Sequence, residues 1–179
     1  MTDTASPLRA APRINLRDAG TFFGLVLIFA VFAVLNPVFL TAPNLINILQ
    51  QSSINACIAL GMTFVIISGG IDLSVGPTAA VSAIVGATLM IAGVPMPLAV
   101  AGAIATGMAC GLFNGVLVAI AGLQPFIVTL GALSLYRALA LIFTGGNPIF
   151  GIPAGFPETI NGMVMGVPVP VIIVAVIAA

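Results

Sequence analysis

The chain has 179 residues, of which 61% are hydrophobic and only 4% are charged, with no net charge. Soluble domains carry about 25% charged residues, so this composition excludes a soluble globular protein and predicts an all-α, polytopic transmembrane bundle in a lipid bilayer. The sequence contains no His and no Lys. It therefore lacks the lysine of a phosphate-binding loop and the usual general base, and we expect no catalytic residue, metal site, cofactor or nucleic-acid partner.

Five of the eight charged residues lie in the first eighteen positions, among them Arg9, Arg13 and Arg17. Residues 1–19 are predicted to be a cytoplasmic tail, because positive charge before a first span favours the cytoplasmic side. Residues 20–179 are predicted to form the transmembrane domain, and the run 20–35 is its first span. No small-residue cleavage site follows this run, so a removable signal peptide is not expected.

The second apolar run extends from Asn44 to Ser68, about 37 Å as a helix at 1.5 Å per residue. Its first half carries four amides, spaced by three and four residues, which share one helical face: Asn44, Asn47, Gln51 and Asn55. Two interpretations stay open here. The amides could sit in the lipid head-group layer, or they could line a solute path, since amides bond well to sugar hydroxyls.

A break follows at Gly69-Gly70, and it carries Asp72, Ser74 and Gly76. An acid within an apolar expanse is a candidate functional residue, because the bilayer makes charge costly. Asp72 could accept hydrogen bonds at the start of the third helix, pair with Arg137 in the fifth apolar run, or contact a solute. Ser74 is a candidate N-cap for that third helix.

The third helix is predicted to run to about Ile91, the fourth to span 98–120 and the fifth to span 126–143. Small residues at spacings of four allow helices to approach closely, and the fourth run has three: Gly107, Gly111 and Gly115. We expect them to pack helices within the chain rather than form a dimer seam.

A Gly/Pro-rich external connection over 145–166 precedes a sixth run, which begins near Val167 and is incomplete at Ala179. The prediction is therefore five full spans and a truncated sixth.

Several motifs in this order closely resemble bacterial sugar permeases of the ribose/xylose/arabinose type, within the branched-chain amino acid/ribose permease family. They are Phe39-Leu40-Thr41, Asn47-Ile48-Leu49, the stretch from Gly61 to Gly76, Gly111 to Gly115, Pro125 to Gly131, Tyr136-Arg137 and Thr144-Gly145-Gly146. In this resemblance Asp72 and its glycine neighbours correspond to the core signature, and Arg137 to a recurrent fifth-helix arginine. Family members are about twice this length, so the chain is expected to be an N-terminal half.

The resemblance implies a permease subunit of an ATP-binding-cassette (ABC) importer in the bacterial inner membrane, without its own ATPase activity. Its expected partners are a cytoplasmic ATPase, a periplasmic sugar-binding protein and a second permease subunit, identical or related. Ribose is the first expected substrate, followed by another pentose or hexose. The alternatives are an ion-coupled secondary transporter, which could use a broken helix and a carboxylate, and a non-transporting accessory protein. An intramembrane protease is excluded because the chain lacks a His and a second membrane Asp.

Overall fold

The computed structural model describes the backbone of residues 16–179 and the side chains of residues 20–179. Most of the predicted cytoplasmic tail therefore lies outside the described residues. The chain divides into two compact units, Met1–Asn47 and Ile48–Ala179.

The first unit contains α1 (Leu16–Leu35) and the turn that follows it. The ring of Phe39 lies 5.2 Å from that of Phe29 in an edge contact and 5.8 Å from that of Phe32 in a stacked one. The Asn36 side chain accepts the Val38 N–H at 2.9 Å, a local bond typical of Asn in turns. These aromatic contacts and this bond fix the path of the chain out of α1.

Helix α2 (Ala42–Ile67) begins in the first unit and ends in the second. Its 26 residues give a length of about 39 Å, more than the roughly 30 Å of bilayer hydrocarbon. The helix ends where the paired glycines predict, because Gly69 adopts a left-handed φ of 82° and the Gly70 N–H returns to the Val65 carbonyl at 3.0 Å. This ending is a common way to satisfy the last carbonyls of a helix.

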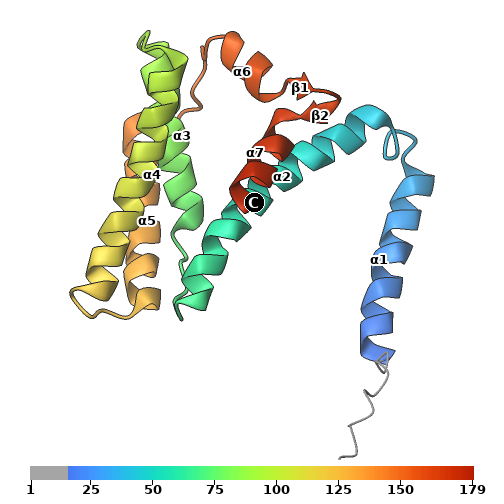
Figure 1. Ribbon diagram of the computed structural model, residues 1–179, viewed down its shortest axis with the longest axis horizontal. Helices are drawn as coiled ribbons and strands as arrows, with labels where there is room; N and C mark the ends of the chain where they lie inside the picture. The colour runs from blue at the N-terminus through green and yellow to red at the C-terminus, as the bar shows by residue number, and fades with distance from the viewer. Residues whose placement is uncertain (1–15) are drawn as a thin grey trace, which may run out of the picture. The chain divides into compact units, whose positions relative to one another are not determined.

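Helices α3 (Val75–Ile91), α4 (Met96–Ala119) and α5 (Pro125–Thr144) stand side by side and pack on one another (Figure 1). Their limits agree with the predicted ones to within two residues. A small core joins them, in which Val81, Ala132 and Tyr136 are buried. This three-helix bundle positions the site described below.

Small residues bring α3 and α4 close together. Of the three glycines predicted to pack helices, only Gly107 lies at this close approach. A Cβ built on Gly86 would lie 3.0 Å from Ala103 Cβ, and one on Gly107 would lie 3.1 Å from Ser82 Oγ. A Cβ on Gly111 or Gly115 would meet nothing within 4 Å. The closest approach therefore lies in the half of α4 before Cys110.

The connection after α5 has more regular structure than predicted. It contains the short helix α6 (Gly155–Ile160) and an antiparallel hairpin of β1 (Met163–Val164) and β2 (Val167–Pro168). The two residues between the strands, Met165 and Gly166, both have positive φ, of 53° and 81°. That conformation suits the right-handed twist of a two-residue hairpin. Helix α7 (Val169–Ala178) follows.

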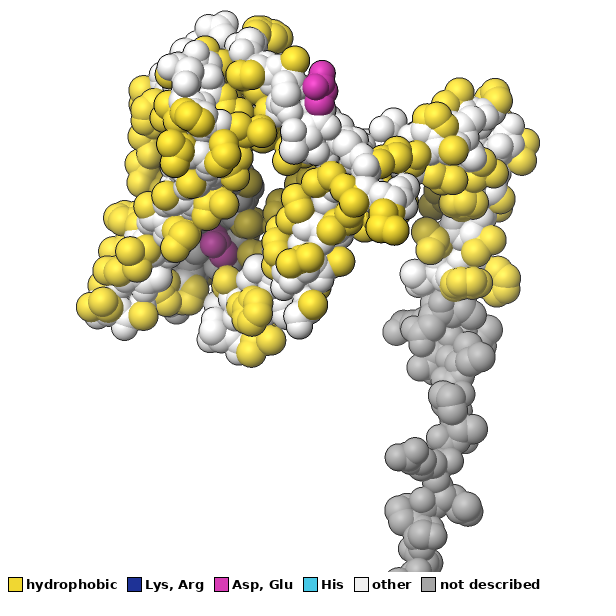
Figure 2. Space-filling view, turned by 45° about the horizontal axis from the view of Figure 1, so that its top comes forward, with side chains coloured by type: hydrophobic (Ala, Val, Ile, Leu, Met, Phe, Trp, Pro, Cys, Tyr) yellow, Lys and Arg dark blue, Asp and Glu magenta, His cyan; other side chains and the backbone are white. Residues whose placement is uncertain are grey.

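Within the described part of the chain, three helices are long and apolar enough to cross a membrane, namely α2, α4 and α5. Shorter apolar helices cover Gly20–Leu35, Val75–Ile91 and Val169–Ala178. Figure 2 shows hydrophobic side chains over most of the visible surface, with acidic groups only at isolated points. The expectation of an all-helical membrane protein is confirmed, apart from the small hairpin. Of the five predicted full spans, three are described as helices long enough to cross a bilayer.

Candidate functional site

The break between α2 and α3 is organised by Asp72 and Ser74. Asp72 Oδ1 accepts two hydrogen bonds from Ser74, one from the backbone N–H at 2.7 Å and one from the hydroxyl at 2.6 Å. Ser74 is fully buried and occupies the N-cap position of α3, but its side chain bonds no helix N–H. Ser74 thus lies at the predicted N-cap position, but the predicted capping bond is not formed. Its hydroxyl donates to the Asp72 carboxylate instead.

This local turn continues into a chain of hydrogen bonds through α4 and α5. Asn114 Nδ2 donates to Ser74 Oγ at 2.8 Å. The Tyr136 hydroxyl shares its one hydrogen between Asn114 Oδ1, at 3.1 Å, and the Cys110 carbonyl, at 3.0 Å. Asn114 and Tyr136 are 6% and 3% exposed. We call Asp72, Ser74, Asn114 and Tyr136 the buried polar chain. It satisfies polar groups that would otherwise be costly to bury.

A second link joins the break to α5. Thr129 is buried, and its hydroxyl lies 2.8 Å from the Pro125 carbonyl and 3.0 Å from the Ile71 carbonyl. A hydroxyl has one hydrogen, so Thr129 shares it between its own helix and the break. The segment before Asp72 is therefore held to α5, and the segment after it to α4.

A cavity of about 280 Å³ lies against the break, α4 and α5. Its lining consists of Val65, Ser68, Gly70, Ile71, Asp72, Gly111, Asn114, Gly115, Val118, Pro125 and Thr129. Gly111 and Gly115 leave space here, since neither would bring a Cβ within 4 Å of another residue. The structure thus brings together Gly70, Asp72, Gly111 and Gly115, which the sequence analysis singled out for different reasons.

Arg137 lies away from this site. Among the described side chains no salt bridge joins it to Asp72, whose Oδ1 is bonded to Ser74 instead. Tyr136 is buried toward α4, and the next residue of a helix projects about 100° further round, so Arg137 is exposed. The hypothesised ion pair is not formed in this structure.

None of the four amides of the predicted polar face of α2 is among the residues that line this cavity. In the first unit Asn44 Nδ2 donates to the Phe39 carbonyl at 2.7 Å, and Asn47 is exposed. In the second unit Gln51 and Asn55 are exposed and do not line the cavity. Gly76 lies in the first turn of α3 with open space beside it.

Asn114 and Thr129 were not recognised as site residues from the sequence. A signal was available, since Asn114 is the only amide of the fourth apolar run and Tyr136 is the only tyrosine of the chain. Polar side chains within apolar spans commonly bond across helices. The hydrogen-bond partners of Asn114 and Thr129, however, lie on segments far apart in the sequence, so the sequence did not indicate which residues they contact.

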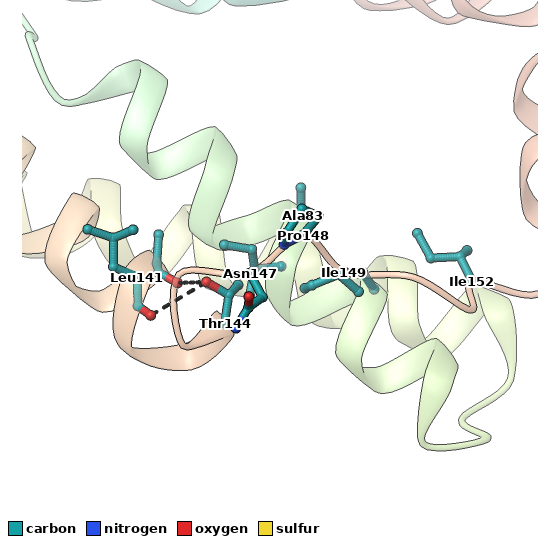
Figure 3. Close-up of a pocket in the computed structure, with 10 residues that line it drawn as sticks. Ala83, Leu141, Thr144, Asn147, Pro148, Ile149 and Ile152 are labelled. Carbon is teal, nitrogen blue, oxygen red and sulfur yellow. Dashed lines mark hydrogen bonds between the residues drawn. The ribbon is translucent and has the colours of Figure 1, made fainter.

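A second cavity, of about 420 Å³, lies between α3, α5 and the segment after α5. Figure 3 shows Leu141 and Thr144 of α5 beside Asn147, with Pro148, Ile149 and Ile152 extending past Ala83 of α3. Thr144 donates back to the carbonyls of its own helix, at 3.0 Å for Ala140. The lining is mostly apolar, and we assign no chemistry to it.

Apolar spans and a broken helix held by a buried polar chain define a polytopic helical membrane protein. The model of the branched-chain amino acid transport system / permease component family matches residues 44–179. The chain belongs to this family. No solved structure matches it.

Among curated relatives, the chain is 43% identical over 161 residues to the D-allose transport system permease protein AlsC of Escherichia coli (strain K12), covering 89% of this chain and 49% of the relative. It is 40% identical over 159 residues to the ribose import permease protein RbsC of Bacillus subtilis (strain 168), covering 88% and 49%. It is 39% identical over 159 residues to the autoinducer 2 import system permease protein LsrD of Enterobacter sp. (strain 638), covering 86% and 49%. The chain spans about half the length of these relatives.

Proposed function

We propose that this chain belongs to the membrane-spanning subunit of an ABC importer that moves a monosaccharide into the cytoplasm. The observation that carries the proposal is its 43% and 40% identity to permease proteins of D-allose and ribose import. Ribose is the first candidate substrate, and allose and other pentoses or hexoses follow. Without a lysine in the sequence, the chain has no phosphate-binding loop, so ATP hydrolysis is assigned to a separate subunit.

The proposed partners are a cytoplasmic ATPase, a periplasmic sugar-binding protein and a second permease subunit. We place the N-terminus in the cytoplasm, because the arginines precede the first span. Helices α1 to α5 would then be five spans. Helix α3, with 17 residues, lies at the lower limit for spanning.

Two groups of residues are proposed for the solute path. The exposed amides of α2, Asn47, Gln51 and Asn55, would face water or solute, because amides left in lipid are costly. Asn44 continues this face. The break, with Asp72, would form the inner end of the path. Gly107 is proposed as a packing residue because of its contact with Ser82, and Gly111 and Gly115 as residues that keep the cavity open.

The test is uptake by the complete permease, reconstituted with its ATPase and binding protein in proteoliposomes. We expect accumulation of labelled D-ribose or D-allose that requires ATP and the binding protein and stops when the phosphate-binding lysine of the ATPase is replaced. Uptake that follows a proton or sodium gradient and ignores ATP would instead establish a secondary transporter. A complex that assembles but transports none of the tested sugars would favour the accessory role.

A further inference from the structure

One oxygen of the Asp72 carboxylate is left unused by the protein. Oδ1 receives both bonds from Ser74, and Oδ2 has no hydrogen-bond partner among the described residues. Among the described residues, Ser82 Oγ is the one side-chain polar atom that is both fully buried and without a partner. Asp72 Oδ2 also has no partner, so it is not fully buried and solvent can reach it. A half-buried carboxylate on a cavity wall thus keeps an acceptor available.

The protein holds this carboxylate in a fixed orientation. Ser74 bonds it on one side, Asn114 holds Ser74, and Thr129 holds the preceding Ile71 carbonyl. Three elements therefore position Asp72, and little ordering remains for a ligand to supply. Such preorganisation is a general means of gaining affinity.

The rest of the cavity suits a small, partly apolar ligand. Val65, Val118 and Pro125 supply apolar walls, and Gly111 and Gly115 supply space without side chains. Ligand pockets commonly combine apolar walls with a few placed polar groups, and pockets for drug-sized ligands start at about 300 Å³. A cavity of about 280 Å³ is therefore suited to a smaller molecule, of monosaccharide size.

The polar lining favours a hydrogen-bond donor over a metal cation. Ser68 donates to the Val65 carbonyl at 2.7 Å, Thr129 is shared between Pro125 and Ile71, and Asn114 is used by Ser74 and Tyr136. Hard cations such as Ca²⁺ take six to eight oxygen ligands, and this wall leaves few oxygens free. A hydroxyl needs only one acceptor.

We propose that this cavity binds the hydroxyl-bearing solute in transit, with Asp72 Oδ2 accepting a hydrogen bond from a sugar hydroxyl. The inference rests on the proposed function and names one contact of the transported sugar. A single charged acceptor beside apolar walls gives a moderate affinity, which suits a protein that must release its solute.

The direct test is Asp72→Asn in the complete, reconstituted transporter. Asn keeps a carbonyl oxygen for Ser74 and so preserves the buried polar chain, but it replaces the free oxygen with an amide donor. We expect thermal unfolding close to wild type and D-ribose or D-allose uptake reduced roughly 10- to 100-fold, the factor for losing a hydrogen bond to a charged group.

A matched pair on α4 tests the cavity itself. Gly115→Leu places a side chain in it, starting from a Cβ that would meet nothing within 4 Å, whereas Ala109→Leu places a leucine at an exposed position about 120° away round the helix. We expect Gly115→Leu to reduce uptake at least tenfold and Ala109→Leu to leave it unchanged. Equal effects from the two variants would overturn the inference.

A measurement that needs no Asp72 variant guards against misfolding. Gly115→Cys, with Cys57 and Cys110 replaced by Ala, is alkylated with N-ethylmaleimide, and we expect the transported sugar to slow the reaction. No protection, or Asp72→Asn uptake equal to wild type, would overturn the proposed contact while wild-type transport still supports the importer. Absence of ATP-driven sugar uptake in the wild type would overturn the proposed function itself.

Discussion

Asn114 on α4 donates a hydrogen bond to the hydroxyl of Ser74, at 2.8 Å and across 40 positions of the sequence. Both side chains are buried, Ser74 completely. Through this bond the start of α3 is fixed to the C-terminal part of a neighbouring helix rather than by its own side-chain cap. The geometry of the break therefore depends on tertiary contacts, and each contact can be tested.

Asn114→Ala removes the bonds to Ser74 and Tyr136 together. Hydrogen bonds between membrane helices average about 0.6 kcal/mol and reach about 1.7, so the loss of two is expected to destabilise the bundle by about 1–3 kcal/mol. Thermal unfolding in detergent measures this change. The control is Asn161→Ala, at an exposed position with no side-chain bond among those described, and equal melting of the two variants would contradict the role given to Asn114.

Thr129→Val keeps the shape of the side chain and removes the shared hydroxyl hydrogen. The Ile71 carbonyl then loses its link to α5, so we expect the break to open more often. Alkylation of Ser68→Cys, in a background without Cys57 and Cys110, is expected to become several-fold faster. Thr144→Val is the matched control, because its hydroxyl donates to the Ala140 carbonyl at 3.0 Å and accepts the Gly146 N–H at 3.2 Å, and neither bond involves the break.

Ser82→Ala is expected to stabilise the protein. The Ser82 hydroxyl is buried against Gly107 without a hydrogen-bond partner, and an unsatisfied buried polar group costs about 1–3 kcal/mol. Ala also has the higher helix propensity. Ser134→Ala, at an exposed position of α5, measures that propensity alone, so a larger rise in Tm for Ser82→Ala is the expected result. An equal or smaller rise would show that the hydroxyl finds a partner.

Exchanging the charges of Asp72 and Arg137 is expected to restore nothing. Asp72→Arg breaks the bonds to Ser74, and Arg137→Asp places no carboxylate near that position, because the two side chains form no salt bridge. The measurement is uptake by the two single variants and the double variant. Recovery in the double variant would show an ion pair in some state of the transport cycle.

The helices could be predicted closely because their signals are local. Paired glycines end α2, Pro125 begins α5 and apolar runs define the lengths between them. The close packing of Gly86 against Ala103 was missed, because small residues are frequent in both helices and spacing alone does not select the pair in contact. The hairpin at Met165-Gly166 was missed because its strands have two residues each, too few for an alternating pattern.

The candidate site was predicted in part. Asp72, Gly70 and three glycines of α4 stood out as local anomalies in apolar sequence. Asp72, Gly70, Gly111 and Gly115 line one cavity, whereas Gly107 packs against Ser82. Asn114 and Thr129 did not, since their importance comes from partners on other helices. The hypothesised ion pair between Asp72 and Arg137 is not formed, because opposite charge alone does not bring two side chains together. The direction in which each side chain projects is set by its position around its own helix and by how the helices pack.

The position of the polar contacts along the chain has a consequence for biosynthesis. Every hydrogen bond of the buried polar chain and of Thr129 joins residues between Ile71 and Tyr136, a single stretch of consecutive helices. The break can therefore take its final form once α5 has entered the bilayer, before the hairpin and α7 follow it.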